Sequence, residues 1–527
     1  MILSRVRSAA ARALPTPRIL TTSAGVSALL AVLVGIAFAP WVRPDLDWED
    51  VADAPNHLIR IYAVGAELAA GNWFPRWLPD LYLGYGYPLL NFYAPSTYYL
   101  GSALHALGLS VYGALQWSGV LAAAAGALGA AALSYSLTRS GLASALAGVI
   151  FLLSPYPFLT NLYVRGALPE ALALALLPWL LLAARALTHG RPWSALALAL
   201  LLALLALTHN VSALLFLPLT LVWVIAAELE VVGGRVRPRI VTSAALALAL
   251  GLGLSAFFWL PALLESRHVQ LELAGGRGGS YDPLYDPLTW LFDPRRTGVA
   301  YAQPLFDYHA LGRAMPERVS PWQIAVWLLV LVAGLARAQH TFGRLALLCA
   351  TVCAVCWFLN TTWSAPVWEG MPLLRVIQFP WRLYGPLALF LATGLAAALA
   401  ALQSHTRWAV RGTALAAPLL VCGLAAGSLT DRPIRFTAPP AHDVDARDLA
   451  AKEYNRYGAG TTSGGEFLPR TVSWAVEGNS RRGIRLYEEA YPQAGWQAGL
   501  VRVLGGRAAV AAIHGDSLGI AAEVAAE

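Results

Sequence analysis

The chain has 527 residues, of which 57% are hydrophobic and only 13% are charged, and its mean hydropathy is +0.56. Soluble domains carry about 25% charged and about 45–50% apolar residues, so this composition excludes a water-soluble globular protein. It also excludes a disordered chain, and four cysteines are too few for a disulfide scaffold. The formal net charge of +7 comes almost entirely from arginine, since Lys452 is the only lysine.

Apolar runs near the length that crosses a bilayer recur along the chain and predict an all-α polytopic membrane protein of about eleven transmembrane helices. The first run ends in small residues, as a cleavable signal peptide does, but Pro40 disfavours cleavage and we expect a retained anchor. The predicted spans are 20–41, 112–137, 141–155, 168–186, 192–208, 211–228, 240–260, 321–336, 345–360, 383–402 and 412–429.

The arginines predict the orientation of these spans. If the N-terminus is cytoplasmic, every short connection on that side is basic, as the positive-inside rule requires. We therefore expect a cytoplasmic N-terminus in a bacterial-type cell (inner) membrane, and no nucleic acid partner. The arginines on this side are Arg5, Arg7, Arg12, Arg18, Arg139, Arg185, Arg191, Arg235, Arg237, Arg239, Arg337, Arg344, Arg407 and Arg411.

This orientation divides the chain into a transmembrane domain, 1–429, and an extracytoplasmic tail, 430–527. Two further long segments lie outside, the first external loop 42–111 and the second large external loop 261–320. Within the tail, residues 471–477 and 485–488 alternate between apolar and polar, which is typical of strands. We therefore expect a small external β-rich domain at the C-terminus.

The first external loop carries a chemically suggestive group. Pro55 suits the first turn of a helix, and its amphipathic sequence predicts a helix over 55–70 along the membrane surface. Asp53, His57 and Arg60 would share one face of it. This trio suits deprotonation of a hydroxyl and binding of a phosphate. The alternative interpretation is that Asp53 caps the helix while His57 and Arg60 are solvated.

The rest of this loop leaves two alternatives open. The acidic residues Asp45, Asp47, Glu49 and Asp50 permit a divalent cation without requiring one, and a solvated acidic loop is the simpler interpretation. Residues 71–95 are dense in aromatics, glycine and proline, which predicts a structured interfacial loop. That loop is either an aromatic belt or the lining for a lipid or sugar acceptor.

Polar residues gather at the outer ends of the spans, whereas the middle of each span is almost free of charge. This pattern disfavours an ion-coupled transporter, which needs ionisable groups at mid-depth. Each residue alone fits a snorkelling anchor, but their shared level predicts a cavity open to the outer leaflet, with arginines facing an anionic group. These residues are Arg165, Glu170, His209, Glu265, His268, Arg375, Gln378 and Arg382.

Seven motifs together resemble the GT-C superfamily of membrane glycosyltransferases, and within it the YfhO-like proteins, also labelled "6-pyruvoyl-tetrahydropterin synthase-related". A second predicted interfacial helix, 95–109, fits the same pattern. The tail motif departs from the family by the two extra residues Gln493 and Ala494. The motifs are Asp53-x-x-x-His57-x-x-Arg60, Pro75-Arg76-Trp77, Gly84-Tyr-Gly86-Tyr-Pro88, Phe92-Tyr93-x-Pro95, Arg165-Gly-x-x-x-Glu170, Phe379-Pro-Trp-Arg382 and Tyr491-Pro-x-x-Gly-Trp496.

The resemblance implies transfer of a sugar from a polyprenyl-phosphate donor to a glycan, lipid or protein acceptor at the outer face, with inversion. Asp53 matches the family's catalytic base. We expect the donor phosphate to be held by Arg165, Arg375, Arg382, His57, Arg60 and His209. We expect substrate contacts from Glu170, Arg76, Tyr93, Gln378, Glu265 and His268.

Two other classes of function stay open on the sequence alone. One is a lipid or polysaccharide transporter or flippase, and the other is a non-catalytic membrane assembly protein whose tail binds a partner. Replacement of Asp53 separates the enzyme from both, because only the enzyme needs a base there. No cofactor is required by the sequence.

Overall fold

The computed structural model describes most of the transmembrane region and short parts of the loops and tail. The described residues are 17–46, 51, 53–82, 86–191, 193–231, 236–271, 306–308, 313–315, 319, 321–371, 374, 377, 379–403, 440, 442–445, 448–449, 466–467, 470, 508–516 and 519–526.

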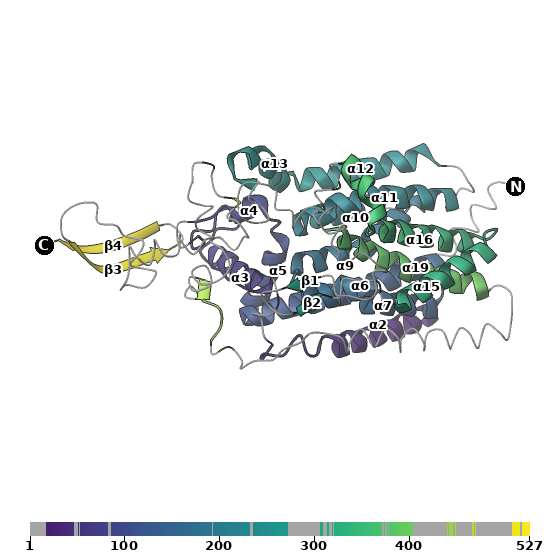
Figure 1. Cartoon of the computed structure of the whole chain (residues 1–527), viewed down its shortest axis with the longest axis horizontal. Helices are drawn as coiled ribbons and strands as arrows, with labels where there is room; N and C mark the ends of the chain where they lie inside the picture. Colours follow the sequence, from purple (N-terminus) through teal and green to yellow (C-terminus); the bar gives the residue numbers. More distant parts are fainter. Residues whose placement is uncertain are drawn as a thin grey trace.

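A bundle of long apolar helices forms the body of the protein (Figure 1). Five described helices are long and apolar enough to cross a membrane, or up to seven if each bent pair is one span. This confirms the predicted all-α polytopic class. The helices of the bundle are α2 (Pro17–Phe38), α6 (Val111–Thr138), α7 (Gly141–Leu153), α9 (Leu168–Thr188), α10 (Ser194–Thr208), α11 (Asn210–Val231), α12 (Pro238–Leu254), α15 (Pro321–Ala336), α16 (Thr341–Phe358) and α19 (Tyr384–Gln403).

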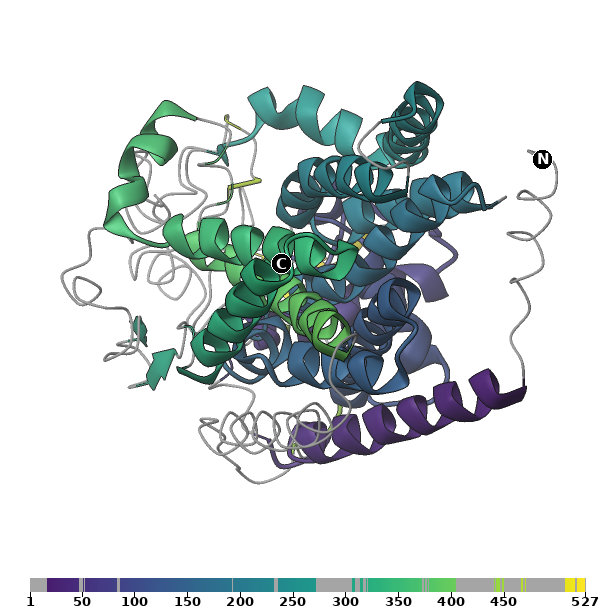
Figure 2. The same cartoon turned by 90° about the vertical axis from the view of Figure 1, so that its right-hand side faces the viewer.

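The core lies where α6 packs against α7 and α9, and where α16 packs against α19. Small residues dominate α6, which is typical of helices that approach closely in a membrane. The span that includes α19 is 94% buried. In contrast, α2 lies at the edge of the bundle against α6 and α7 (Figure 2).

Two of the predicted spans are bent. The predicted span 240–260 divides into α12 and α13 (Ala256–Glu265), which meet at 68°. At the bend, the Ser255 hydroxyl donates to the Gly251 carbonyl. The other bend, of 44°, separates α7 from the π-helix η2 (Pro155–Thr160) and α8 (Asn161–Tyr163). The predicted span 412–429 lies outside the described residues.

Helices of the first external loop cover one end of the bundle, which we call the loop end (Figure 1). Its helices α3 (Ala54–Ala69) and α5 (Ser96–Ala106) lie where surface helices were predicted, with α4 (Leu89–Phe92) before α5. Helix α3 packs on α5, and α5 packs on the start of α6. Arg139 follows the other end of α6, and Arg237 donates to the Thr188 carbonyl at the end of α9. Predicted cytoplasmic arginines therefore lie opposite the loop end.

Short elements complete the described chain. They are η3 (Ser266–His268), η6 (Thr362–Ser364), α17 (Ala365–Gly370), η7 (Pro380–Leu383) and the antiparallel pair β1 (Phe306–Tyr308) and β2 (Arg313–Met315).

Residues around Asp443 and Phe467 of the tail contact the loop end. Both carboxylate oxygens of Asp443 accept from the Val111 N–H at the start of α6, each at 2.9 Å. The Phe467 N–H donates to the Tyr87 hydroxyl. Further along, β3 (Ala508–Asp516) and β4 (Gly519–Ala526) form an antiparallel hairpin. The predicted strands 471–477 and 485–488 lie outside the described residues, so the external β-rich domain stays a prediction.

Candidate active site

Three charged residues from separate elements meet at the loop end. The Glu170 Oε2 atom lies 2.9 Å from Arg165 Nη1 and 3.3 Å from Arg382 Nε. Their exposed fractions are 3% for Glu170, 7% for Arg165 and 8% for Arg382. Two guanidinium groups share one carboxylate, so this trio is formally positive. A buried charge of this kind favours an anion nearby.

Local sequence explains why these side chains converge. Gly166 has a φ of +62°, so the chain turns sharply after Arg165. Pro169 then lies at the start of α9 and Glu170 in its first turn, where an acidic residue complements the helix dipole. Arg382 lies in the last turn of η7, which Pro380 begins.

Two residues that the sequence did not single out complete the cluster. The Tyr156 hydroxyl donates to Glu170 Oε1 at 2.5 Å. Arg165 Nη1 donates to the Tyr156 oxygen at 3.1 Å and to Asn161 Oδ1 at 2.6 Å. Both partners are on the distorted helical segment that follows α7. These hydrogen bonds fix the orientation of Arg165 and Glu170.

His209 lies in the turn between α10 and α11, and the charges of this cluster act on its pKa. Burial, together with the positive charges of Arg382 and Arg165, lowers the pKa of His209 to about 3 despite the opposing charge of Glu170. Its Nδ1 accepts from the Ser212 N–H at 3.3 Å and lies 2.8 Å from the Ser212 hydroxyl. The ring is therefore neutral at pH 7, and the assigned proton is on Nε2.

Asp53 lies immediately before α3, and its backbone N–H donates to the Arg165 carbonyl at 2.8 Å. Its side chain is exposed and makes no capping hydrogen bond to α3. The capping interpretation is therefore wrong, because the residue adopts a helical conformation rather than the extended one that a cap needs. The structure instead joins the backbone of Asp53 to the arginine cluster.

His57 and Arg60 are buried, with exposed fractions of 2% and 4%. The Tyr98 hydroxyl lies 2.9 Å from His57 Nδ1 and accepts from Arg60 Nη1 at 2.8 Å. Burial raises the pKa of Tyr98 well above its usual value, so its hydroxyl keeps its proton. Arg60 also stacks 4.3 Å from the centre of the Tyr93 ring. The interpretation of His57 and Arg60 as solvated is wrong, because both join α3 to α5.

Other predicted substrate contacts lie on one hydrogen-bonded bridge. Arg76 Nη2 donates to the Phe257 carbonyl at 2.6 Å, and its Nη1 donates to Asn91 Oδ1 at 3.5 Å. Asn91 Nδ2 donates to Glu265 Oε2 at 2.6 Å. This bridge joins the first external loop to α13.

The remaining predicted site residues lie elsewhere. The side chain of His268 is exposed and accepts from Arg267 Nε at Nε2, while its carbonyl accepts from the Arg470 N–H. Arg375 and Gln378 lie outside the described residues. The predicted cavity facing the outer leaflet stays a prediction.

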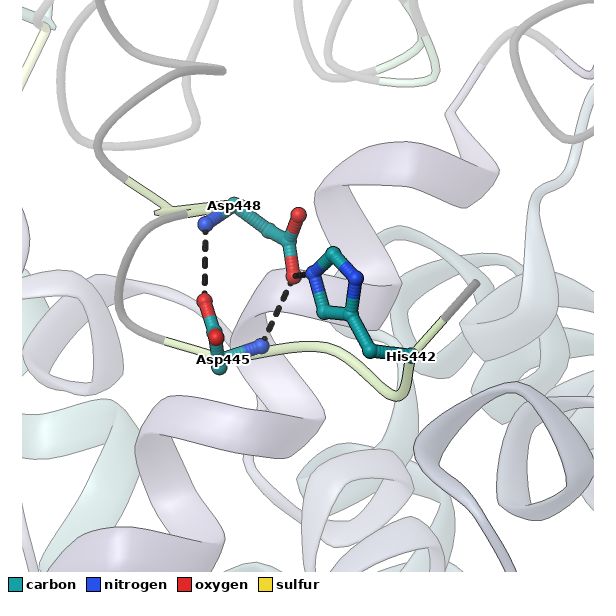
Figure 3. A group of neighbouring side chains, drawn as sticks. All are labelled: His442, Asp445 and Asp448. Carbon is teal, nitrogen blue, oxygen red and sulfur yellow. Dashed lines mark hydrogen bonds and ion pairs between the residues drawn. The ribbon is translucent and has the colours of Figure 1, made fainter. Parts of the chain in front are cut away.

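A divalent cation was predicted as permitted but not required, and the described acidic residues leave this prediction open. Asp45 forms a 2.6 Å ion pair with Arg43, while Asp47, Glu49 and Asp50 lie outside the described residues. Ligand atoms of His442, Asp445 and Asp448 lie within 4.8 Å of one another (Figure 3). The two aspartates accept from each other's backbone N–H, and His442 lies 3.2 Å from Asp448. The reciprocal contacts of the two aspartates are those of a local turn.

Comparison with known proteins supports the family resemblance over one segment. Residues 90–274 match the 6-pyruvoyl-tetrahydropterin synthase related domain, described as a membrane protein. This confirms the predicted resemblance to that membrane protein family within the matched residues. The segment includes the Arg165–Glu170 motif and the whole of α13. No curated protein matches the chain.

Two solved structures are similar at low sequence identity. One is the apo oligosaccharyltransferase from Archaeoglobus fulgidus, with a TM-score of 0.45, 13% identity, and coverage of 89% of this chain and 60% of that chain. The other is ArnT from Cupriavidus metallidurans bound to undecaprenyl phosphate, with a TM-score of 0.33, 13% identity, and coverage of 70% and 78%. The chain thus spans about 60% of the oligosaccharyltransferase. At these TM-scores, neither likeness bears on activity.

Proposed function

We propose that this protein is a membrane glycosyltransferase that moves a sugar from a polyprenyl-phosphate donor to an acceptor hydroxyl. The observation that carries the proposal is the hydrogen bond between the Asp53 backbone and the Arg165 carbonyl. It holds an exposed carboxylate next to the segment that presents a buried, formally positive cluster. A base and a phosphate site are the two parts that this reaction needs.

The proposed reaction is a single displacement. The acceptor hydroxyl gives its proton to the Asp53 carboxylate while its oxygen forms a bond to the anomeric carbon. The bond from that carbon to the phosphate oxygen breaks, and polyprenyl phosphate leaves with the electron pair. Attack opposite the leaving group inverts the anomeric configuration. Because a phosphate is a stable anion, no strong general acid is needed.

Arg165 and Arg382 offset the negative charge of the leaving phosphate in this proposal, and the Nε2–H of neutral His209 is a further donor. Glu170 orients the two arginines. Its short contacts to both of them support this role. His57 and Arg60 hold α3 in place through Tyr98. Arg375 retains its predicted role in binding the donor phosphate, and Gln378 its predicted role as a substrate contact.

The reaction is proposed at the extracytoplasmic face. Arg139 and Arg237 at the end opposite the site support this orientation under the positive-inside rule. The bridge through Arg76, Asn91 and Glu265, together with Tyr93 and His268, then faces the acceptor side. The donor reaches the site within the bilayer, and the acceptor is a glycan, a lipid or a protein.

The test is transfer from a panel of radiolabelled polyprenyl-phosphate sugars in membranes that contain the protein, with membranes lacking it as the control. The proposal expects transfer from at least one donor, and an anomeric configuration in the product opposite to that of the donor. Product with retained configuration contradicts the single displacement. Donor binding without transfer to any acceptor contradicts the proposal that the protein is a glycosyltransferase.

A further inference from the structure

Helix α13 exposes its apolar side. The exposed fractions are 46% for Phe257, 41% for Leu260, 64% for Leu263 and 60% for Leu264. At 3.6 residues per turn, these four residues share one side of the helix. The opposite side carries Phe258, which is 3% exposed. A helix in water shows the reverse arrangement, with its polar side exposed.

Hydrogen bonds tie both ends of α13 to the first external loop, although Glu265 at its end is an exposed residue. Glu265 is bound by Asn91 of α4, and the Phe257 carbonyl is bound by Arg76. Helix α13 contacts α4 at the loop end (Figure 1). These contacts fix the rotation of the helix about its axis, so the exposure of its leucines is built into the fold.

Helix α12, which precedes α13 in the chain, also exposes a row of leucines. Leu246, Leu250 and Leu254 of α12 are 65%, 49% and 44% exposed and are spaced one turn apart. The 68° bend at Ser255 then turns the chain, so α13 lies across the direction of the span rather than along it. Exposed leucines are therefore present on both sides of the bend.

Aromatic residues of the first external loop extend this apolar surface. The rings of Phe74 and Phe257 meet edge to face, with centres 5.2 Å apart. Nearby in the sequence, Trp73 is 76% exposed and Trp77 is 48% exposed. We call α13 and residues 73–77 together the α13 platform. Tryptophan is the residue that membrane interfaces favour most, because its ring is apolar and its N–H is polar.

We infer that the α13 platform binds the outer leaflet of the bilayer, at the boundary between headgroups and acyl chains. Three observations carry this assignment: the exposed apolar side of α13, the exposed leucines of α12 that precede it in the chain, and the exposed tryptophans on either side of Phe74 and Arg76, which contact Phe257. A contiguous apolar surface of this kind is rare on a part of a protein that faces water. The inference is independent of the proposed chemistry, because it concerns only where the loop end meets lipid.

The test measures the depth of a spin label in lipid nanodiscs. A cysteine replaces Leu264, and separate variants carry a cysteine at Leu250 of α12 as the deep reference and at His442 of the tail as the aqueous reference. All three side chains are exposed, so the substitutions do not disturb packing. Cys349, Cys353 and Cys356 are buried, and labelling of the unsubstituted protein measures any background.

Collision of the label with oxygen, which enters lipid, is compared with collision with a water-soluble nickel chelate. The inference predicts that the label at 264 lies between the two references, near headgroup depth, and that Leu260→Cys gives the same depth. If the nickel chelate reaches the label at 264 as readily as the label at 442, the inference is wrong. A label at 264 that lies as deep as the label at 250 also overturns the inference, because α13 would then continue the span. If the nickel chelate reaches the label at 264 in nanodiscs but not in native membranes, the surface binds another protein instead of lipid.

Discussion

The Asp53 backbone N–H and the Arg165 carbonyl oxygen are joined by a 2.8 Å hydrogen bond. This bond fixes the start of α3 against the turn that precedes α9. Any movement of Arg165 and Gly166 is therefore transmitted to the proposed base. The distance between base and phosphate site depends on this turn, which gives a prediction at Gly166.

Substituting Gly166→Ala should lower stability and displace Asp53. An added Cβ would lie 2.4 Å from the Ala54 backbone nitrogen, and φ at this position is +62°. The left-handed conformation alone costs about 1–2 kcal/mol for alanine, and the contact with α3 adds to it. The thermal unfolding temperature of the purified protein and the rate of sugar transfer are both expected to fall.

Gly190→Ala is the matched control for this substitution. Its φ is +65°, but nothing lies within 4 Å of an added Cβ. The control should show the conformational cost alone and retain transfer. Equal losses in the two variants would mean that the approach of Gly166 to Ala54 does not position α3.

Glu170→Gln should destabilise the protein strongly. The substitution leaves Arg165 and Arg382 buried without the carboxylate that they share. Breaking a buried pair of this kind costs about 3–5 kcal/mol. Asp45→Asn, which breaks the exposed pair with Arg43, is the control and should leave the unfolding temperature nearly unchanged. Similar unfolding temperatures for the two variants would show that the cluster does not stabilise the fold.

The low pKa of His209 predicts a pH dependence of stability. The pKa is about 3 in the folded protein, whereas an unfolded histidine titrates near pH ~6.5. Between these values the unfolded state binds the extra proton, so the contribution of His209 to stability is present above about pH 6.5 and is lost as the pH falls toward 3. His209→Gln should unfold with a weaker loss of thermal stability between pH 7 and pH 5. The same loss in wild type and variant would refute a neutral, buried His209. The exposed His442→Gln serves as control.

The sequence predicts the helices well where the chain gives a clear local signal. Pro55 and an amphipathic pattern place α3 over Ala54–Ala69, close to the predicted 55–70. The bend at Ser255 was missed because α12 and α13 are both apolar, and hydropathy carries no information on direction. As a result, the predicted span 240–260 is two helices that meet at 68° rather than one straight helix.

From the sequence, the site could be predicted only as a set of residues at the same depth, near the outer ends of the spans. Arg165, Glu170 and Arg382 were expected at the outer ends of the spans, but their mutual contacts depend on how three elements pack. The burial of His57 and Arg60 depends on Tyr98, a residue of another helix, and spacing within α3 cannot reveal it. Tyr156 had no signal at all, because its role arises from the distorted turn after α7.

The most direct test of the account is the transfer rate of Asp53→Asn in membranes, measured beside Asp45→Asn at equal protein abundance and with donor binding recorded for both. The account predicts that Asp53→Asn binds the polyprenyl-phosphate donor and unfolds at the wild-type temperature, yet transfers no sugar, while Asp45→Asn transfers at the wild-type rate. An Asp53→Asn variant as active as the wild type would contradict the assignment of Asp53 as the base.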